Sequence, residues 1–246
     1  MNRVDWHYWS QFLGDIANAY EEIGSPEVVW YRGVTDGSHT LRPSLLRFGN
    51  GAVKERDLFD RFTQIARGSE FGLGGGADEW DVLFQMQHFG VPTRLLDWSE
   101  VFGISIFFAT LSSRAPNDSY VYILNPRRLN EKAGKETLLD DFDRQEFRYR
   151  SIFWDGKPFK PSSPLAINPV HSNPRLAAQT GRFTVHGVDP RALEEIAPDC
   201  VRKVRLGRDA FPAAYEFLRM AGINELRVFP DVGGAASFLK NLVGLA

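Results

Sequence analysis

Short apolar runs alternate with amphipathic segments along the whole chain, and this alternation is the feature that most constrains the fold. Runs rich in β-branched and aromatic residues predict strands at 28–33, 120–124, 165–167, 182–186, 201–206 and 226–229. Apolar residues spaced three or four apart predict helices at 6–23, 53–67, 80–89, 101–111, 190–196, 209–220 and 233–242. No fixed-period repeat or linker interrupts the pattern. We therefore expect one α+β domain over residues 1–246, with small antiparallel or mixed sheets flanked by helices and with residues 1–24 as an N-terminal helix.

Two stretches lack a clear pattern. The glycine-rich stretch 72–76 formally matches a dinucleotide-binding fingerprint, but that fingerprint follows a strand, whereas a predicted helix precedes this one. We expect a connection there. Residues 130–164 are charged and proline-containing, and we expect a loop with local helix. Asp189 and Asp231 stand where the N-caps of the following helices are expected.

Charge and cysteine content narrow the class of protein. The 29 Lys and Arg residues balance 31 Asp and Glu residues, giving a net charge of −2, which argues against a general electrostatic grip on nucleic acid. The one cysteine, Cys200, excludes an internal disulfide framework and is expected to be a small buried residue. The chain shows no secretory signal and no apolar run of 18 residues, so we expect a cytoplasmic protein without a membrane span.

Three clusters combine polar side chains with glycine or proline residues that end or turn a secondary-structure element. In the first, Arg32 ends an apolar strand and is followed by Gly33. A guanidinium there either pairs internally or points into a cleft, where it can bind a phosphate or carboxylate through two hydrogen bonds. Both interpretations are open at this point.

The second cluster is QHFGVPTRLLDW at 87–98, which holds five polar side chains beside a helix end. His88 is placed to bond the last carbonyls of its helix, and Arg94 is placed to pair with Asp97. Because functional side chains gather on loops held by rigid elements, we expect at least one residue of this block, which includes Thr93, to act in binding.

The third cluster is NPRLAAQTGRF at 173–183. Arg175 and Gln179 are four positions apart and share a face on a helical turn. Gly181 permits a close backbone approach before the next strand, and the alternative for Gln179 is that it caps a helix end.

Other chemistries lack a sequence signature. No metal-ligand spacing of Cys or His residues is present, and neither a phosphate loop nor a G-x-S-x-G nucleophile elbow occurs. The adjacent acids at 140–141 and 194–195 are typical of solvated surface. We therefore predict no metal site, and a nuclease that needs clustered acids is not supported.

Several blocks of the sequence together resemble the FRG domain family. They are YRG at 31–33, QHFGVPTRLLDW at 87–98, IFFA at 106–109, NPRLAAQTGRF at 173–183, Gly-Ile at 222–223 and Phe-Pro-Asp at 229–231. These blocks span about residues 28–240, which we take as the core of the domain. The resemblance implies a protein of bacterial or phage conflict, either a defence factor or a toxin.

A looser similarity is to ADP-ribosyltransferases and implies NAD as the cofactor. In that fold an arginine at the end of the first core strand holds phosphate or nicotinamide ribose, and Arg32 matches that arginine in position and kind. A later hydroxyl, supplied here by Thr93 or Ser99, supports the nicotinamide side. A late glutamate bonds the ribose, but Gln179 stands at that place, and Gln carries no charge to favour a cationic transition state. Glu225 is a substitute in a plausible place.

The resemblance thus implies catalytic roles for Arg32, Gln179 and Glu225. It implies NAD binding by Arg32, Gly33, His88, Thr93, Arg94, Asp97 and Arg175. The expected partners are a nucleotide substrate and a protein or nucleic-acid acceptor. The alternative is a non-catalytic module that senses a nucleotide, nucleic acid or protein, and a deep pocket around Arg32, Asp97 and Gln179 would favour the enzyme.

Overall fold

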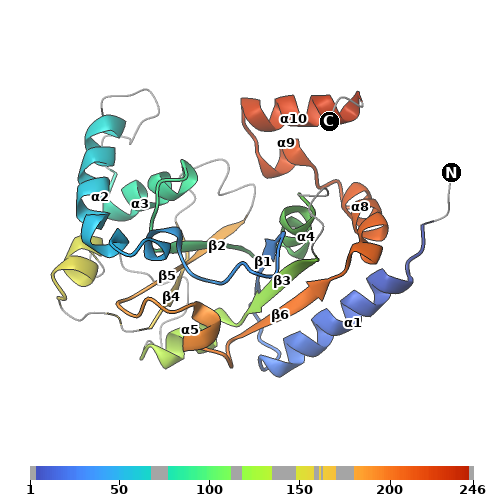
Figure 1. The fold of residues 1–246 in the computed structure, drawn as a ribbon, viewed down its shortest axis with the longest axis horizontal. Helices are drawn as coiled ribbons and strands as arrows, with labels where there is room; N and C mark the ends of the chain where they lie inside the picture. Colours follow the sequence, from blue (N-terminus) through green and yellow to red (C-terminus); the bar gives the residue numbers. More distant parts are fainter. Residues whose placement is uncertain are drawn as a thin grey trace.

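A computed structural model describes residues 4–67, 77–111, 118–134, 148–157, 161, 163–169 and 180–243. These residues build a six-stranded sheet in the order β4-β5-β2-β1-β3-β6, with every neighbouring pair antiparallel (Figure 1). The strands are β1 (Trp30–Val34), β2 (Leu95–Ser99), β3 (Ser119–Leu124), β4 (Leu165–Ile167), β5 (Gly181–Val185) and β6 (Val201–Leu206). The α+β prediction is confirmed, and one continuous antiparallel sheet replaces the small sheets that we expected.

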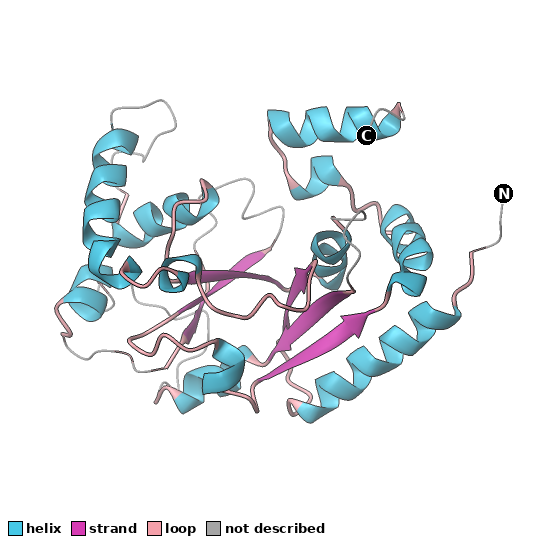
Figure 2. Cartoon of the chain, in the orientation of Figure 1, coloured by secondary structure: helices cyan, strands magenta, loops and turns pink. Residues whose placement is uncertain are grey.

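Helices surround the sheet (Figure 2). They are α1 (His7–Glu22), α2 (Gly51–Arg67), α3 (Glu79–His88), α4 (Phe102–Thr110), α5 (Pro126–Lys132), α7 (Leu193–Ile196), α8 (Phe211–Met220), α9 (Glu225–Val228) and α10 (Val232–Leu242). Short turns of tighter or wider helix occur at η1 (Ser44–Arg47), η2 (Arg150–Trp154) and η3 (Arg208–Ala210). In the described part of the chain, no helix combines the length and the apolar character that a membrane span requires.

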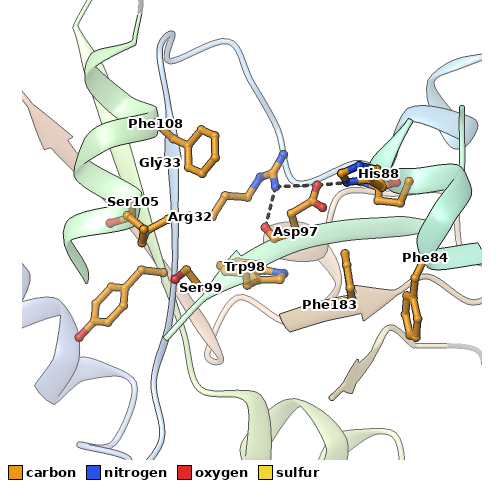
Figure 3. Close-up of a pocket in the computed structure, with 13 residues that line it drawn as sticks. Arg32, Gly33, Phe84, His88, Asp97, Trp98, Ser99, Ser105, Phe108 and Phe183 are labelled. Carbon is orange, nitrogen blue, oxygen red and sulfur yellow. Dashed lines mark hydrogen bonds and ion pairs between the residues drawn. The ribbon is translucent and has the colours of Figure 1, made fainter. Parts of the chain in front are cut away.

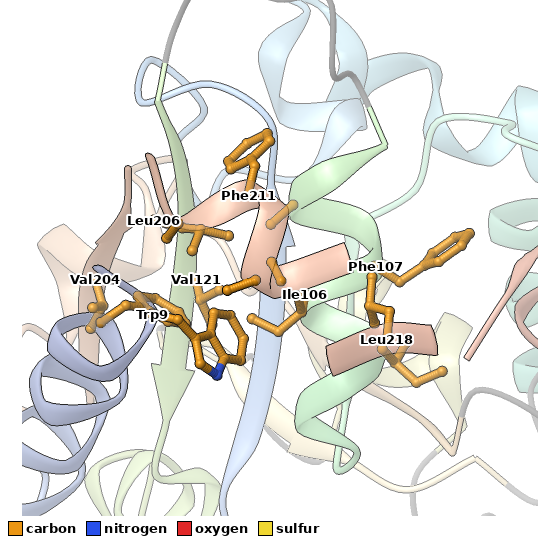
Figure 4. Close-up of a cluster of buried hydrophobic side chains, with 14 of the residues drawn as sticks. Trp9, Ile106, Phe107, Val121, Val204, Leu206, Phe211 and Leu218 are labelled. Carbon is orange, nitrogen blue, oxygen red and sulfur yellow. The ribbon is translucent and has the colours of Figure 1, made fainter. Parts of the chain in front are cut away.

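Two hydrophobic clusters cover the same face of the sheet. One packs α1, α4 and α8 against β3 and β6 and includes Trp9, Ile106 and Val121 (Figure 4). The other packs α2, α3 and η2 against β4 and β5 and includes Trp80 and Phe183. Full burial of each large apolar side chain contributes about 1.5–3 kcal/mol to stability. The predicted N-terminal helix is therefore part of the core, since Trp9 lies on α1.

A third cluster closes the opposite face, where Trp30, Leu96, Trp98 and Tyr122 pack together. Cys200 belongs to this cluster and is buried, as predicted, and its burial raises the pKa of the thiol to about 11. The sheet is thus covered by two clusters on one face and by one on the other. The boundary between the paired clusters falls at β1 and β2.

Several local predictions are wrong or incomplete. Residues 226–229 were predicted as a strand but lie in and after helix α9, because the Asn224 side chain caps a helical turn by accepting from Arg227 N. Asp189 does not cap α7; its carboxylate accepts from the backbone and side chain of Arg191, and Ala192 is the N-cap. The sequence analysis also missed α5 and the strand character of 95–99. Asp231 caps α10, as predicted.

Candidate functional site

A pocket of about 230 Å³ opens where β1 and β2 separate (Figure 3). The two strands pair only at Tyr31 and Ser99, whereas β1 pairs with β3, and β2 with β5, along their whole lengths. Beyond the Tyr31–Ser99 pair the space between the strands is filled by side chains and by the pocket. Its lining residues are Tyr31, Arg32, Gly33, Phe84, Gln87, His88, Asp97, Trp98, Ser99, Ile104, Ser105, Phe108 and Phe183.

Aromatic rings form much of the wall. Phe84 of α3 stacks on Phe183 of β5 with ring centroids 5.0 Å apart, and Phe108 approaches from α4 on the other side. The Trp98 indole is fixed, because its Nε1 donates to the Thr184 hydroxyl at 3.1 Å. Fixed rings of this kind suit a planar ligand, since they offer large apolar faces without losing much side-chain freedom on binding.

Arg32 bridges the gap between the strands. Its Nη1 donates to the main-chain carbonyl oxygen of Asp97 at 2.6 Å and lies 3.6 Å from the Asp97 carboxylate. The guanidinium therefore takes the place of a backbone bond that the separated strands cannot make. A guanidinium has five N–H donors, and Nε and Nη2 of Arg32 have no hydrogen-bond partner among the described residues. Arg32 thus makes the internal pair and still presents a free donor edge.

Asp97 is held in turn by Gln87 and Thr93. The Gln87 side-chain Nε2 donates to Asp97 Oδ2 at 2.7 Å, and the Thr93 hydroxyl donates to the Gln87 side-chain oxygen Oε1. Thr93 is buried and does not line the pocket, whereas Ser99, the other predicted hydroxyl, does. The block at 87–98 therefore forms a chain of hydrogen bonds that ends at Arg32, with His88 beside it on the pocket wall.

Gly33 lines the pocket, but its lack of a side chain serves packing. A Cβ built at Gly33 lies 1.8 Å from the Ser105 carbonyl oxygen and 2.7 Å from the Ala109 backbone nitrogen. Helix α4 therefore packs directly on the backbone of β1. This contact fixes the wall that carries Ser105 and Phe108.

Arg94 lies outside the pocket, so its predicted role in binding NAD has no support in the geometry. Its Nε donates to both oxygens of Glu55, and its Nη1 donates to the Gly187 carbonyl at 2.6 Å. Tyr149 and Trp154 also donate to the Glu55 carboxylate. The predicted pairing of Arg94 with Asp97 is wrong, because Arg94 pairs with Glu55 and Asp97 pairs with Arg32.

The remaining predicted residues are Glu225, which the structure describes, and Arg175 and Gln179, which it does not. Glu225 lies in the first turn of α9, where its carboxylate accepts from Asn241, and it does not line the pocket. Arg175 and Gln179 lie outside the described residues, as does the glycine-rich stretch 72–76. Across the described ranges, no three His, Cys, Asp or Glu side chains are grouped closely enough to hold a metal ion.

Sequence reasoning did not select Gln87, Phe84, Phe108 or Phe183 as individual site residues. Phe84 is four positions before His88 on α3, a spacing that places both on one helix face. That spacing was the signal available. Phe108 and Phe183 were inside blocks that had been singled out, but an apolar ring in an apolar segment does not distinguish a pocket wall from the core.

Comparisons with known proteins support the family and nothing finer. No curated protein and no solved structure matches the chain. The model of the FRG domain matches residues 27–118, a segment that includes Arg32, Gly33, His88 and Asp97. The blocks near residues 173–183 and 222–231 lie beyond that match. The resemblance seen in the sequence is thus confirmed over residues 27–118, where the chain matches the model of the FRG domain.

Proposed function

We propose that the pocket between β1 and β2 binds NAD and that the domain transfers ADP-ribose to an acceptor. One observation carries this proposal. A single pocket brings together a guanidinium with a free donor edge, a carboxylate and several fixed aromatic rings. Pockets that combine apolar walls with a few convergent polar groups are the usual sites of small-molecule binding.

The residues present fit the chemical groups of a nicotinamide dinucleotide. The rings of Phe84, Phe108 and Phe183 suit a planar base, and the free edge of Arg32 suits a phosphate oxygen pair. The pocket of about 230 Å³ is smaller than the roughly 300–1,000 Å³ of typical ligand sites. It therefore matches one nucleoside half of the dinucleotide, with the phosphates toward Arg32.

Asp97 is the carboxylate that lines the pocket, and we assign it the role that Gln179 and Glu225 were predicted to fill. Transfer breaks the bond between ribose C1′ and the nicotinamide nitrogen, and nicotinamide leaves with the bonding electron pair. The acceptor supplies the electron pair for the new bond to C1′ and releases a proton. Asp97 stabilises the positive charge that develops on the ribose, and Gln87 holds the carboxylate in place.

Incubation with radiolabelled NAD and cell extract tests this function, together with calorimetric titration of NAD. Arg32→Ala is expected to weaken NAD binding by about 1.5–3 kcal/mol, the contribution of a hydrogen bond to a charged group. Arg61→Ala is the matched control, since Arg61 forms an exposed ion pair on α2. Asp97→Asn is expected to lower turnover more than binding. The absence of NAD binding, transfer and NAD cleavage together contradicts the proposal.

NAD binding without transfer or cleavage would instead support a nucleotide-sensing module. The observation that favours this second function is the small number of acidic side chains at the pocket, since Asp97 is the carboxylate among its lining residues in the described structure. Under either function we propose a cytoplasmic role in bacterial or phage conflict, as the family resemblance implies. Survival of expressing cells during phage challenge, with Arg32→Ala as the inactive comparison, measures that role.

A further inference from the structure

A second pocket, here called the Arg56 pocket, lies beside α2 and shares no lining residue with the Arg32 pocket. Its volume of about 540 Å³ is within the range of roughly 300–1,000 Å³ that is typical of small-molecule sites. Its walls come from η1, α2, η2, the residue before β2 and the loop after β5. The lining residues are Leu46, Ala52, Val53, Arg56, Arg94, Phe153, Trp154, Val188 and Pro190.

Apolar side chains form most of the wall of the Arg56 pocket. Phe153 is buried in the cluster that covers β4 and β5, whereas Val53 and Val188 are exposed to solvent. The Trp154 indole is held in place, because its Nε1 donates to the Glu55 carboxylate at 3.1 Å. The pocket therefore leaves apolar surface in contact with water, and an apolar ligand gains free energy by covering it.

The buried Arg94 adds no net charge to this pocket. Its Nε donates to both carboxylate oxygens of Glu55. Tyr149 donates to one of these oxygens and Trp154 to the other, so each oxygen accepts two hydrogen bonds. The Glu55 carboxylate is thus engaged inside the buried cluster, and the charge of Arg94 compensates its charge there.

Arg56 is an uncompensated positive charge at the pocket. Its guanidinium lies over the Trp154 ring, 5.6 Å from the ring centroid, and it forms no ion pair with a described residue. Glu55, the adjacent residue on α2, is already engaged by Arg94. A cation held over an indole face, beside apolar walls, is well placed to attract an anion.

The other charged groups near the pocket cancel one another. The Asp189 carboxylate, in the loop after β5, pairs with Arg191. Lys54 and Asp155 each follow a lining residue in the chain, but neither lines the pocket, and their charges are opposite. One positive charge, that of Arg56, therefore remains to be compensated.

We propose that the Arg56 pocket binds an organic monoanion, a carboxylate attached to an apolar or aromatic body. The carboxylate pairs with the Arg56 guanidinium, whose planar fork can bind two oxygens at once, and the body lies against Trp154 and Phe153. A single negative charge fits, because a second one would be repelled by the Glu55 carboxylate without gaining a further free cation. This site does not depend on the proposed function, since the two pockets have separate linings.

Calorimetric titration of the full chain with phenylbutyrate, its uncharged amide phenylbutyramide, and phenyl phosphate tests this site. We expect phenylbutyrate to bind about fivefold more tightly than the amide, and this advantage to fall as salt is raised. Arg56→Gln should remove the advantage, because it removes the charge and keeps a polar side chain. Val53→Asp should weaken phenylbutyrate but not the amide, because it places an acid on the exposed rim. Arg61→Gln, at an exposed position on the same helix, is the matched control.

Each outcome decides for or against the site. Equal affinity of phenylbutyrate and the amide, no binding of phenylbutyrate at millimolar concentration, or an affinity that Arg56→Gln leaves unchanged would overturn it. Tighter binding of phenyl phosphate than of phenylbutyrate would contradict the assignment of a monoanion. Arg32→Ala should leave the affinity for phenylbutyrate unchanged, and a loss in this variant would place the probe in the Arg32 pocket instead.

Discussion

Two arginine–carboxylate pairs, Arg94–Glu55 and Arg32–Asp97, show how the same chemistry serves stability in one place and binding in another. The side chains of Arg94 and Glu55 are 8% and 4% exposed, and Tyr149, Trp154 and the Gly187 carbonyl occupy further hydrogen-bonding positions. The side chains of Arg32 and Asp97 are 24% and 53% exposed, and part of the guanidinium has no partner. The pair that serves stability is buried and its hydrogen-bonding groups are occupied, whereas the pair placed for binding is partly exposed and keeps donors available.

Breaking the buried pair Arg94–Glu55, here called the closed pair, should cause the largest loss of stability; Arg32–Asp97 is the open pair. Glu55→Ala leaves Arg94 buried without its carboxylate and removes the acceptor of Tyr149 and Trp154. Loss of one partner of a buried ion pair costs about 3–5 kcal/mol. Urea unfolding measures the change. The double variant Glu55→Leu with Arg94→Met should recover much of the loss, because an apolar pair leaves no isolated charge; a double variant as unstable as the single one would contradict this account.

Gly33→Ala tests whether the wall of the open pair is rigid. The added methyl group meets the Ser105 carbonyl oxygen and the Ala109 nitrogen, which are backbone atoms of α4 and cannot move aside as a side chain can. We expect a loss of about 3 kcal/mol in the free energy of unfolding, at the upper end for overpacked sites. Gly49→Ala is the control, since nothing lies within 4 Å of its added Cβ. Equal stability of the two variants would show that β1 and α4 separate easily.

The free energy of unfolding should also depend on pH, through His186 next to Arg94. His186 is buried, its backbone N–H donates to the Arg94 carbonyl, and its ring nitrogens have no partner among the described residues. Burial, followed by the charge of Arg94, lowers its pKa to about 3, with Arg42 acting in the same direction and Asp189 against it. The unfolded chain therefore binds more protons than the folded one below about pH 6.5.

Stability should then decrease as the pH falls from about 6.5 toward 3, with a slope of about 1 kcal/mol per pH unit between pH 6 and 5. Denaturant unfolding at several pH values measures this slope. His186→Leu is expected to reduce this slope, whereas His39→Leu, the same exchange at an exposed histidine, should leave it unchanged. An unaltered slope in His186→Leu would assign the pH dependence to other groups.

The open pair should give the smallest change in stability. Exposed or half-exposed ion pairs contribute about 0–1 kcal/mol, so Asp97→Asn is expected to change the free energy of unfolding by less than about 1 kcal/mol. The comparison with Glu55→Ala under the same urea conditions makes the contrast quantitative. A loss from Asp97→Asn as large as that from Glu55→Ala would place both pairs in the same structural class.

Elements with clear periodicity could be predicted from the sequence. Elements whose type depends on contacts between residues far apart in the chain could not. The strand at 201–206 and the helix capped by Asp231 were predicted because period and capping residue agree. The strand predicted at 226–229 failed because a four-residue apolar run has no distinguishing period, and Asn224 decided for a helical turn.

The site divides along the same line. Arg32 and Asp97 could be selected as polar residues at the ends of apolar runs, and the fold brings them together. Arg94 has the same local features, but Glu55 is 39 positions earlier, and nothing local to either residue announces their pairing. The order of the strands, which puts β1 beside β2, is likewise a property of long-range pairing, and so is the single β1–β2 pair at Tyr31 and Ser99, which leaves room for the pocket.

The pairing of β1 with β2 has a mechanical consequence. Two three-stranded ladders, β4-β5-β2 and β1-β3-β6, are joined by one backbone pair at Tyr31 and Ser99, by the Arg32 bond to the Asp97 carbonyl oxygen, and by the apolar contacts of Trp30, Leu96 and Trp98 on one face. Separating neighbouring strands of the sheet should therefore cost the least free energy between β1 and β2. Backbone amides on the facing edges of β1 and β2 should exchange with deuterium faster than those between β3 and β6. A ligand bound between β1 and β2 should slow this exchange, because it adds a further connection between the two strands.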